Sequence, residues 1–212
     1  MIEPIENFTG KIHCEDCLET MARMPDKSVD LVLTDPPYGI NYNPNGGNGV
    51  TKRGTYKRII GDNKPFDPSF LLCFPNIILW GANHYANKLP ASSGWLVWNK
   101  IGEGKSSDCS DVELAWTNKK MPARRFNYLW RGMIRQGKRE KRIHPTQKPI
   151  ALMRWCLSLF PNCNTVLDPF LGSGTTAIAC KELGRKYIGI EISPEYCKIA
   201  ENRLKNTMES LL

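Results

Sequence analysis

Short apolar runs recur along the chain, and each ends in a polar residue, a glycine or a proline. Continuous apolar runs of this length are typical of strands in a parallel sheet, which are buried on both faces. The clearest runs are Val29–Thr34, Asn76–Trp80, Gly94–Trp98, Thr165–Asp168 and Tyr187–Glu191, and Lys11–Cys14 is a further candidate. Val112–Trp116 and Arg125–Trp130 have the pattern of two more strands, which could form a hairpin.

Helical periodicity follows or separates several of these runs. It predicts helices over Pro149–Phe160, Thr175–Leu183 and Pro194–Met208. Ser193 is a candidate N-cap for the last helix, and Pro194 suits its first position. Strands that alternate with helices predict an α/β fold, with a mostly parallel sheet covered on both faces and an antiparallel hairpin at its edge. At 212 residues the chain is long enough for one such domain, over residues 1–212.

Charge adds an expectation about the partner. Lys and Arg number 29 against 21 Asp and Glu, a net charge of +8, which makes a polyanion worth testing. Two polar segments depart from the strand and helix patterns: Asn41–Lys64 is rich in Asn, Gly, Lys and Arg, and Arg131–Arg142 is densely basic. Both are expected to be loops, either in contact with the partner or simply solvated.

Other compositional features exclude some classes of protein. No apolar run approaches the roughly 20 residues of a membrane-spanning helix, and the first residues lack the pattern of an export signal. The chain is therefore expected in the cytoplasm, with no membrane partner. The eight cysteines are scattered, and the pair Cys14 and Cys17 has no second pair at zinc-site spacing. Reduced, packed thiols and no metal are expected.

The sequence Asp35-Pro36-Pro37-Tyr38 directly follows an apolar strand. Two consecutive prolines are stiff and cannot donate backbone hydrogen bonds. They lie where ligands bind in open α/β sheets, at the carboxyl end of a strand. A carboxylate, carbonyl acceptors and an aromatic ring suit a planar group that carries an NH2. The alternative is a tight turn with a capping Asp.

A second motif has the order strand, Gly-rich turn, helix. It runs from Asp168 through Gly172 and Gly174 to Thr175, and it lets the backbone approach a ligand at a helix N-terminus. Glu191 ends a strand 17 residues after Gly174, an offset at which an acidic residue binds ribose hydroxyls. Because threonines replace the third glycine of the dinucleotide motif, a smaller nucleoside-bearing cofactor is favoured.

Together these motifs resemble the DNA methyltransferases that methylate exocyclic amines with S-adenosylmethionine. Asp35, Pro36, Pro37 and Tyr38 are similar to the catalytic tetrapeptide of that family. The resemblance implies that the cofactor is bound by Asp16, Cys17, Asp35, His144, Thr146, Lys148, Asp168, Pro169, Phe170, Gly172, Ser173, Gly174, Thr175, Glu191 and Ile192. For Asp16 a helix cap is an equal alternative, and so is a helix start for His84, whose position flanks the base or cofactor in the family.

The catalytic strand precedes the cofactor strand, an order similar to the β group of the family. The resemblance implies a single permuted Rossmann-like domain. It also implies a base flipped out of double-stranded DNA, with Asp35 and the Pro36 carbonyl accepting hydrogens from its amine while Tyr38 stacks on the ring. Asp at the first position favours adenine N6 over cytosine N4. A non-catalytic nucleic-acid-binding module is the alternative from another class, although the residues of both motifs are intact.

Few segments of this chain are candidates for recognising a DNA sequence. The candidate DNA-contacting loops are residues 41–64 and 131–143, with charge supplied by Arg53, Lys57, Arg58, Arg135, Lys138, Arg139 and Arg142. Charge of this kind positions a protein on DNA without specifying the sequence. A short or relaxed recognition site is therefore expected, and a homodimer is a hypothesis for supplying further contacts.

Overall fold

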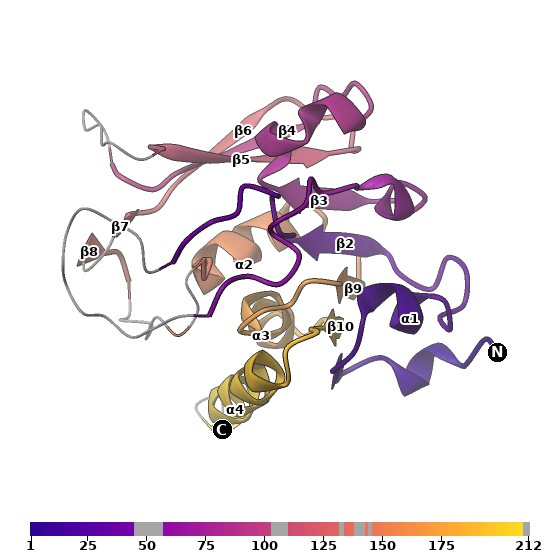
Figure 1. Ribbon diagram of the computed structural model, residues 1–212. Coiled ribbons are helices and arrows are strands. Elements are labelled where there is room, and N and C mark those ends of the chain that lie inside the picture. The colour runs from indigo at the N-terminus through magenta and orange to yellow at the C-terminus, as the bar shows by residue number, and fades with distance from the viewer. Residues whose placement is uncertain (45–56, 103–109, 132–133, 138–142, 144–145, 210–212) are drawn as a thin grey trace.

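The computed structural model describes residues 1–44, 57–102, 110–131, 134–137, 143 and 146–209. Within these ranges the molecule is built on an eight-stranded sheet (Figure 1). In order across the sheet, the strands are β1 (Lys11–His13), β10 (Lys186–Ile190), β9 (Thr165–Asp168), β2 (Leu31–Thr34), β3 (Ile77–Trp80), β5 (Val112–Thr117), β4 (Trp95–Asn99) and β6 (Arg124–Asn127). A separate two-stranded sheet pairs β7 (Trp130–Arg131) with β8 (Ile134–Arg135).

The five strands from β1 to β3 in this order are parallel to one another. Their carboxyl ends therefore meet at one edge of the sheet. Strand β5 runs antiparallel to both β3 and β4, whereas β6 is parallel to β4. The prediction of a mostly parallel sheet in an α/β fold is confirmed.

The expected pairing of Val112–Trp116 with Arg125–Trp130 is wrong. The antiparallel hairpin consists of β4 and β5, and β4 separates β5 from β6. Burial explains the order: β4 carries Leu96 and Trp98, which are fully buried, whereas both arginines of β6 are exposed. An apolar strand gains from a neighbour on each side, and a charged strand is suited to the outer edge.

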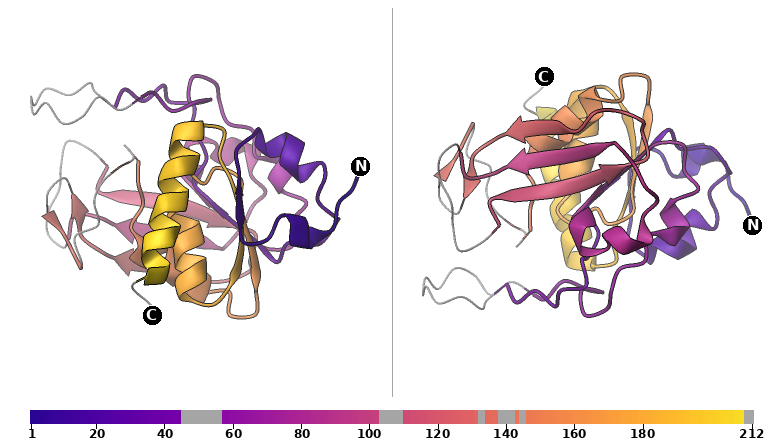
Figure 2. Two further views of the ribbon diagram at one scale, coloured as in Figure 1. Left: turned by 90° about the horizontal axis from the view of Figure 1, so that it is seen from below. Right: turned by 90° about the horizontal axis from the view of Figure 1, so that it is seen from above.

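Helices cover both faces of the sheet, as predicted. One face carries α2 (Ile150–Ser158), α3 (Thr175–Glu182) and α4 (Pro194–Glu209); the other carries α1 (Cys17–Met21) and the 3₁₀ turns η1 (Ile5–Asn7), η2 (Ser69–Leu71), η3 (Ala82–His84) and η4 (Ala86–Lys88). In Figures 1 and 2, α3 and α4 lie on the side away from the N-terminal α1. Among the described residues, none of these helices is long and apolar enough to cross a membrane.

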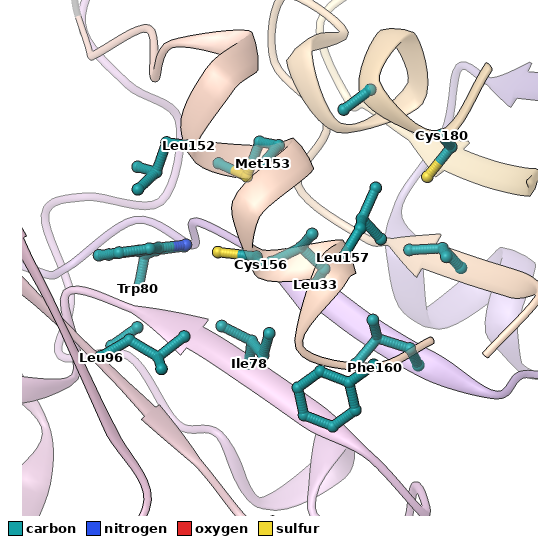
Figure 3. Packing of buried hydrophobic residues seen from close by; sticks show 14 of the residues in the cluster. Leu33, Ile78, Trp80, Leu96, Leu152, Met153, Cys156, Leu157, Phe160 and Cys180 are labelled. Carbon is teal, nitrogen blue, oxygen red and sulfur yellow. The ribbon is translucent and has the colours of Figure 1, made fainter. Parts of the chain in front are cut away.

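Alternate side chains of the central strands enter two separate cores. Leu33 of β2 and Ile78 of β3 pack toward α2, as Figure 3 shows, whereas Val32 and Ile77 point to the opposite core. Both cores exclude solvent from the strands, so neither face of β2 or β3 can be polar. This is the physical reason for the unbroken apolar runs in the sequence.

We expect Leu33→Ala to lower the free energy of unfolding by about 2–5 kcal/mol, because it leaves a cavity in a tightly packed core. Leu33 is 0% exposed, whereas Leu183, at the end of α3, is 45% exposed. The matched control Leu183→Ala should cost less than about 1 kcal/mol. Urea denaturation at one protein concentration measures both values, and equal losses would contradict the core assignment.

Candidate active site

The common edge of the parallel strands opens into a cavity of about 890 Å³. Five segments that each follow a strand contribute to its lining: Asp16 after β1, Asp35–Tyr38 after β2, His84 after β3, residues of the Gly-rich loop (Pro169, Phe170 and Gly172) after β9, and Glu191 after β10. The two motifs that the sequence singled out, more than 130 residues apart, therefore share one cavity. This is the position at which open α/β sheets bind ligands.

Asp35 is held by two side chains. The Tyr38 hydroxyl donates to Asp35 Oδ1 at 2.5 Å, and Lys148 Nζ donates to Oδ2 at 2.5 Å. Lys148 Nζ also lies 3.2 Å from the Tyr38 hydroxyl oxygen. The protein thus occupies both carboxylate oxygens of Asp35 with its own donors.

Glu113, which the sequence reasoning missed, extends this cluster. Its Oε2 lies 3.1 Å from Lys148 Nζ, and its Oε1 accepts from Lys100 Nζ at 2.9 Å. Glu113 belongs to β5, whose antiparallel course brings its amino end to the edge where the parallel strands have their carboxyl ends. Acidic site residues were sought at the carboxyl ends of apolar runs, whereas Glu113 lies at the amino end of its strand. Charges alternate along the cluster, from Lys100 through Glu113 and Lys148 to Asp35.

Burial and neighbouring charges shift the pKa values of this cluster. Burial raises the pKa of Asp35 and Glu113 adds to the rise, although Lys148 opposes it. Burial alone would lower the pKa of Lys148, but Asp35 and Glu113 outweigh it and hold this pKa above its usual range. Burial would likewise raise the pKa of Glu113, but Lys148 and Lys100 bring it below its usual value. The lysine therefore remains an ammonium between two carboxyl groups.

The Tyr38 ring is fixed by its surroundings. It stacks on His84 with ring centroids 4.9 Å apart and planes 16° apart. A Cβ on Gly81, which has φ +70°, would lie 1.9 Å from the Tyr38 ring, so only glycine fits there. Burial raises the pKa of Tyr38 well above its usual value, and Asp35 adds to this effect, so the hydroxyl keeps its proton. His84 ends a 3₁₀ turn, so the expected helix start is wrong at this position, and its side chain lines the cavity.

Asp62 organises the loop after Tyr38 and was also missed. Its Oδ1 accepts from the Gly39 N–H at 2.9 Å, and its Oδ2 accepts from the Tyr42 N–H at 2.6 Å. Asp62 is only 4% exposed although it comes from a polar segment. No local sequence signal distinguishes it from the other polar residues around it.

Glu191 lies in another part of the cavity lining. Its Oε2 accepts from the Gly172 N–H at 2.8 Å and its Oε1 from the Ser193 N–H at 2.8 Å. Burial raises the pKa of Glu191, and these backbone donors oppose the rise. Asp16 lines the same cavity and caps α1 by accepting from the Leu18 N–H at 2.8 Å, so the cap and the cavity position coexist.

Several cofactor candidates build the Gly-rich loop without lining the cavity. Asp168 is buried and accepts from the Thr34 hydroxyl at 2.6 Å and from the Phe170 N–H at 3.1 Å. The Ser173 carbonyl accepts from Arg203 Nη1 of α4 at 2.6 Å, a contact the sequence could not indicate. Gly174 has φ +86°, and a Cβ there would lie 2.8 Å from Ala200 Cβ. Thr175, at the start of α3, is buried as well.

All but one of the remaining cofactor candidates line the cavity. Cys17, Pro169, Phe170, Gly172, Ile192, Thr146 and Lys148 line the cavity. The side-chain nitrogen Nζ of Lys148 contacts the carboxylates of Asp35 and Glu113. His144 lies outside the described residues.

Of the predicted DNA-contacting residues, Lys57, Arg58 and Arg135 line the cavity. Lys57 pairs with Glu195 at 2.7 Å, and the Arg135 guanidinium lies over the Trp130 ring at 4.7 Å from its centroid. Arg53, Lys138, Arg139 and Arg142 lie outside the described residues. The described ends of both candidate loops therefore reach the site.

Comparison with known proteins identifies the family. A family model described as DNA methylase matches residues 76–202, more than half of the chain. The chain belongs to this family of N6/N4 DNA methyltransferases. This methylase is 29% identical to the type II methyltransferase M.HinfI of Haemophilus influenzae, over 97% of its own length and 71% of that protein. It is 27% identical to M2.DpnII of Streptococcus pneumoniae, over 92% of its own length and 89% of that protein.

Solved structures agree with this assignment. The M1.HpyAVI–SAM complex is 27% identical and matches with a TM-score of 0.53, covering 92% of the methylase and 99% of that chain. The cytosine-N4-specific PvuII DNA methyltransferase, at 15% identity and a TM-score of 0.59, is similar in fold over 95% of each chain. The methylase uses S-adenosylmethionine and acts on DNA, as its family does.

The buried carboxyl group of Asp168 makes stability depend on pH. Burial raises its pKa to about 6 from the usual 3.8, so the folded state favours the protonated acid. The wild type therefore loses stability as pH rises from about 4 through the folded-state value near 6. Asn keeps an acceptor for Thr34 and Phe170 but carries no charge.

We expect Asp168→Asn to raise the free energy of unfolding by about 1–3 kcal/mol at pH 8 and by much less at pH 4. Denaturant titrations at the two pH values measure the difference. The control is the exposed Asp26, whose replacement by Asn should show no such divergence. A stabilisation that is equal at both pH values would contradict the raised pKa.

Proposed function

We propose that this methylase transfers the methyl group of S-adenosylmethionine to N6 of an adenine flipped out of double-stranded DNA. The observation that carries the proposal is the Asp35 carboxylate, held by Tyr38 and Lys148 in the cavity that Glu191 also lines. Asp as the first residue of the tetrapeptide favours adenine over cytosine. A cytosine-N4 activity is the alternative, because a cytosine-N4 enzyme has a similar fold.

Asp35, Pro36, Pro37 and Tyr38 are the proposed catalytic residues. Asp35 and the Pro36 carbonyl accept hydrogens from the exocyclic amine, which turns the nitrogen lone pair toward the methyl donor. Correct positioning supplies much of the acceleration of such a transfer. Tyr38, already held by His84 and Gly81, gives the flipped base an aromatic surface, and base–aromatic stacking is worth about 1–3 kcal/mol.

The residues of the cavity fit the cofactor. Glu191 retains acceptor capacity for ribose hydroxyls, because each carboxylate oxygen takes about two hydrogen bonds and one on each is already used. Asp16, Cys17, Phe170 and Ile192 line the cavity beside it and are proposed to hold the nucleoside. When bound, the cofactor supplies a methyl group activated by its sulfonium.

Lys57, Arg58 and Arg135 are proposed to contact phosphates. Lys57 is largely exposed, and all three line the cavity that would receive the base. Binding through phosphates weakens as salt rises. Such contacts favour a short or relaxed recognition site.

We expect the purified methylase, given labelled S-adenosylmethionine and mixed duplex DNA, to produce N6-methyladenine after digestion to nucleosides. Asp35→Ala and Tyr38→Ala should each lower the rate by about 100-fold or more, because they remove the acceptor and the ring that position the base. The exposed Asp26→Ala is the matched control and should retain full activity. Detection of N4-methylcytosine instead would mean that the target base is cytosine and not adenine. The absence of any methylated nucleoside despite cofactor binding would overturn the proposal.

We infer that a second copy of the chain adds to the DNA interface, because the phosphate contacts proposed among the described residues are limited to Lys57, Arg58 and Arg135. Sedimentation should detect a dimer in the presence of duplex DNA. A monomer both with and without DNA would contradict this inference.

A further inference from the structure

In the arrangement that the structure shows, a substrate amine must share the Asp35 carboxylate with two donors of the protein itself. Its Oδ1 already accepts from Tyr38 and its Oδ2 from Lys148, both at 2.5 Å. Each oxygen keeps room for one further hydrogen bond, but the Lys148 ammonium is a charged donor and competes with an amine hydrogen for Oδ2. Asp35 becomes a better acceptor for the amine if Tyr38 or Lys148 moves off its oxygen.

Tyr38 is the less mobile of the two donors. Its ring stacks on His84, and Gly81 lies too close to the ring to carry a Cβ. Lys148 ends in a flexible four-carbon chain, although the residue is only 6% exposed. The lysine is therefore the donor that can move with the smaller disturbance of its neighbours.

Glu113 offers Lys148 a second acceptor. Its Oε2 lies 3.1 Å from Lys148 Nζ, yet this buried oxygen receives no well-aligned hydrogen bond from any of the described residues. A buried acceptor without a hydrogen bond is costly, so a small shift of the ammonium toward it is favourable. Lys100, bonded to Oε1 of the same carboxylate, keeps Glu113 in place.

We propose that Glu113 is a positioning residue that draws Lys148 away from Asp35 when the target amine arrives. This inference rests on the proposed function of Asp35. Lys148 moves from one carboxylate to the other as an ammonium, so no proton is transferred and the net charge of the cluster does not change. Asp35 Oδ2 becomes free for an amine hydrogen, and the loss of a close cation makes it a stronger acceptor while positive charge develops on the amine nitrogen.

The proposal predicts that two damaging substitutions partly compensate. In Glu113→Gln the lysine has lost its charged alternative and remains on Asp35, where it competes with the substrate. In Lys148→Met two carboxyl groups face each other without the cation between them, which disfavours the ionised form of Asp35. In the double variant the competitor and the second carboxylate are both gone, and Asp35 retains the Tyr38 donor.

The experiment measures kcat/KM for DNA and, by calorimetry, the Kd of S-adenosylhomocysteine for each full-length variant. Each single substitution should lower kcat/KM by about 10–100-fold, and the double variant should exceed Glu113→Gln by about tenfold. The Kd should change by less than about threefold throughout, because the nucleoside-binding residues are untouched. Glu182→Gln, which breaks the surface pair with Arg154, is the matched control and should leave both values unchanged.

A double variant no more active than Glu113→Gln would overturn the proposal, because it would mean that Lys148 assists the reaction directly. A rescue accompanied by an equal recovery of cofactor affinity would also overturn it, because the defect would then be structural. The variant Asp35→Ala distinguishes a failure of the proposed catalytic function from a failure of the proposed role of Glu113. If that variant remains active, the proposed function of the site fails, whereas an inactive Asp35→Ala with no rescue removes only the role of Glu113.

If Glu113→Gln does not fold, the wild type provides the test. The structure to determine is its complex with S-adenosylhomocysteine and a duplex that contains the methylated site identified from its own product. Lys148 Nζ should be hydrogen-bonded to Glu113 and separated from Asp35. A lysine still bonded to Asp35 beside a bound base would overturn the proposal.

Discussion

The parallel course of β1, β10, β9, β2 and β3 is the constraint on which the rest of the molecule depends. Parallel strands direct their carboxyl ends to one edge, so every loop that follows a strand contributes to the same cavity. Parallel strands are also covered on both faces, which accounts for the two separate cores. The fold thereby combines a rigid apolar sheet with polar residues concentrated at its edge.

The concentration of charge at that edge has a cost in stability that the cluster itself limits. Lys148 is buried and Asp35 and Glu113 are mostly buried, and each charge is accompanied by an opposite one. Burial raises the pKa of Asp168 to about 6, and the donors to its carboxylate, the Thr34 hydroxyl and the Phe170 N–H, carry no charge that would offset the rise. Buried groups of this kind reduce stability and persist where a site requires them.

In the proposed mechanism, the Lys148 ammonium holds Asp35 until the target amine arrives. A lysine ammonium on Asp35 satisfies the carboxylate when no base is present, so the site does not hold an uncompensated buried charge. The same contact would oppose substrate if the lysine had no other acceptor. Glu113 resolves this conflict in the proposed mechanism, since it allows the cation to remain in the cluster while Asp35 changes partners.

Features that depend on neighbours along the chain can be derived without the fold. Apolar runs and helical periodicity located most strands and helices, and Asp35 and Tyr38 contact each other because they are only three residues apart. Contacts between distant residues follow only from the folded arrangement. Lys148 meets Asp35 across 113 positions, Arg203 supports the loop at Ser173, and β4 rather than β6 pairs with β5. Local patterns report which residues seek burial, but the partner that each obtains depends on how the whole sheet packs, which no short segment encodes.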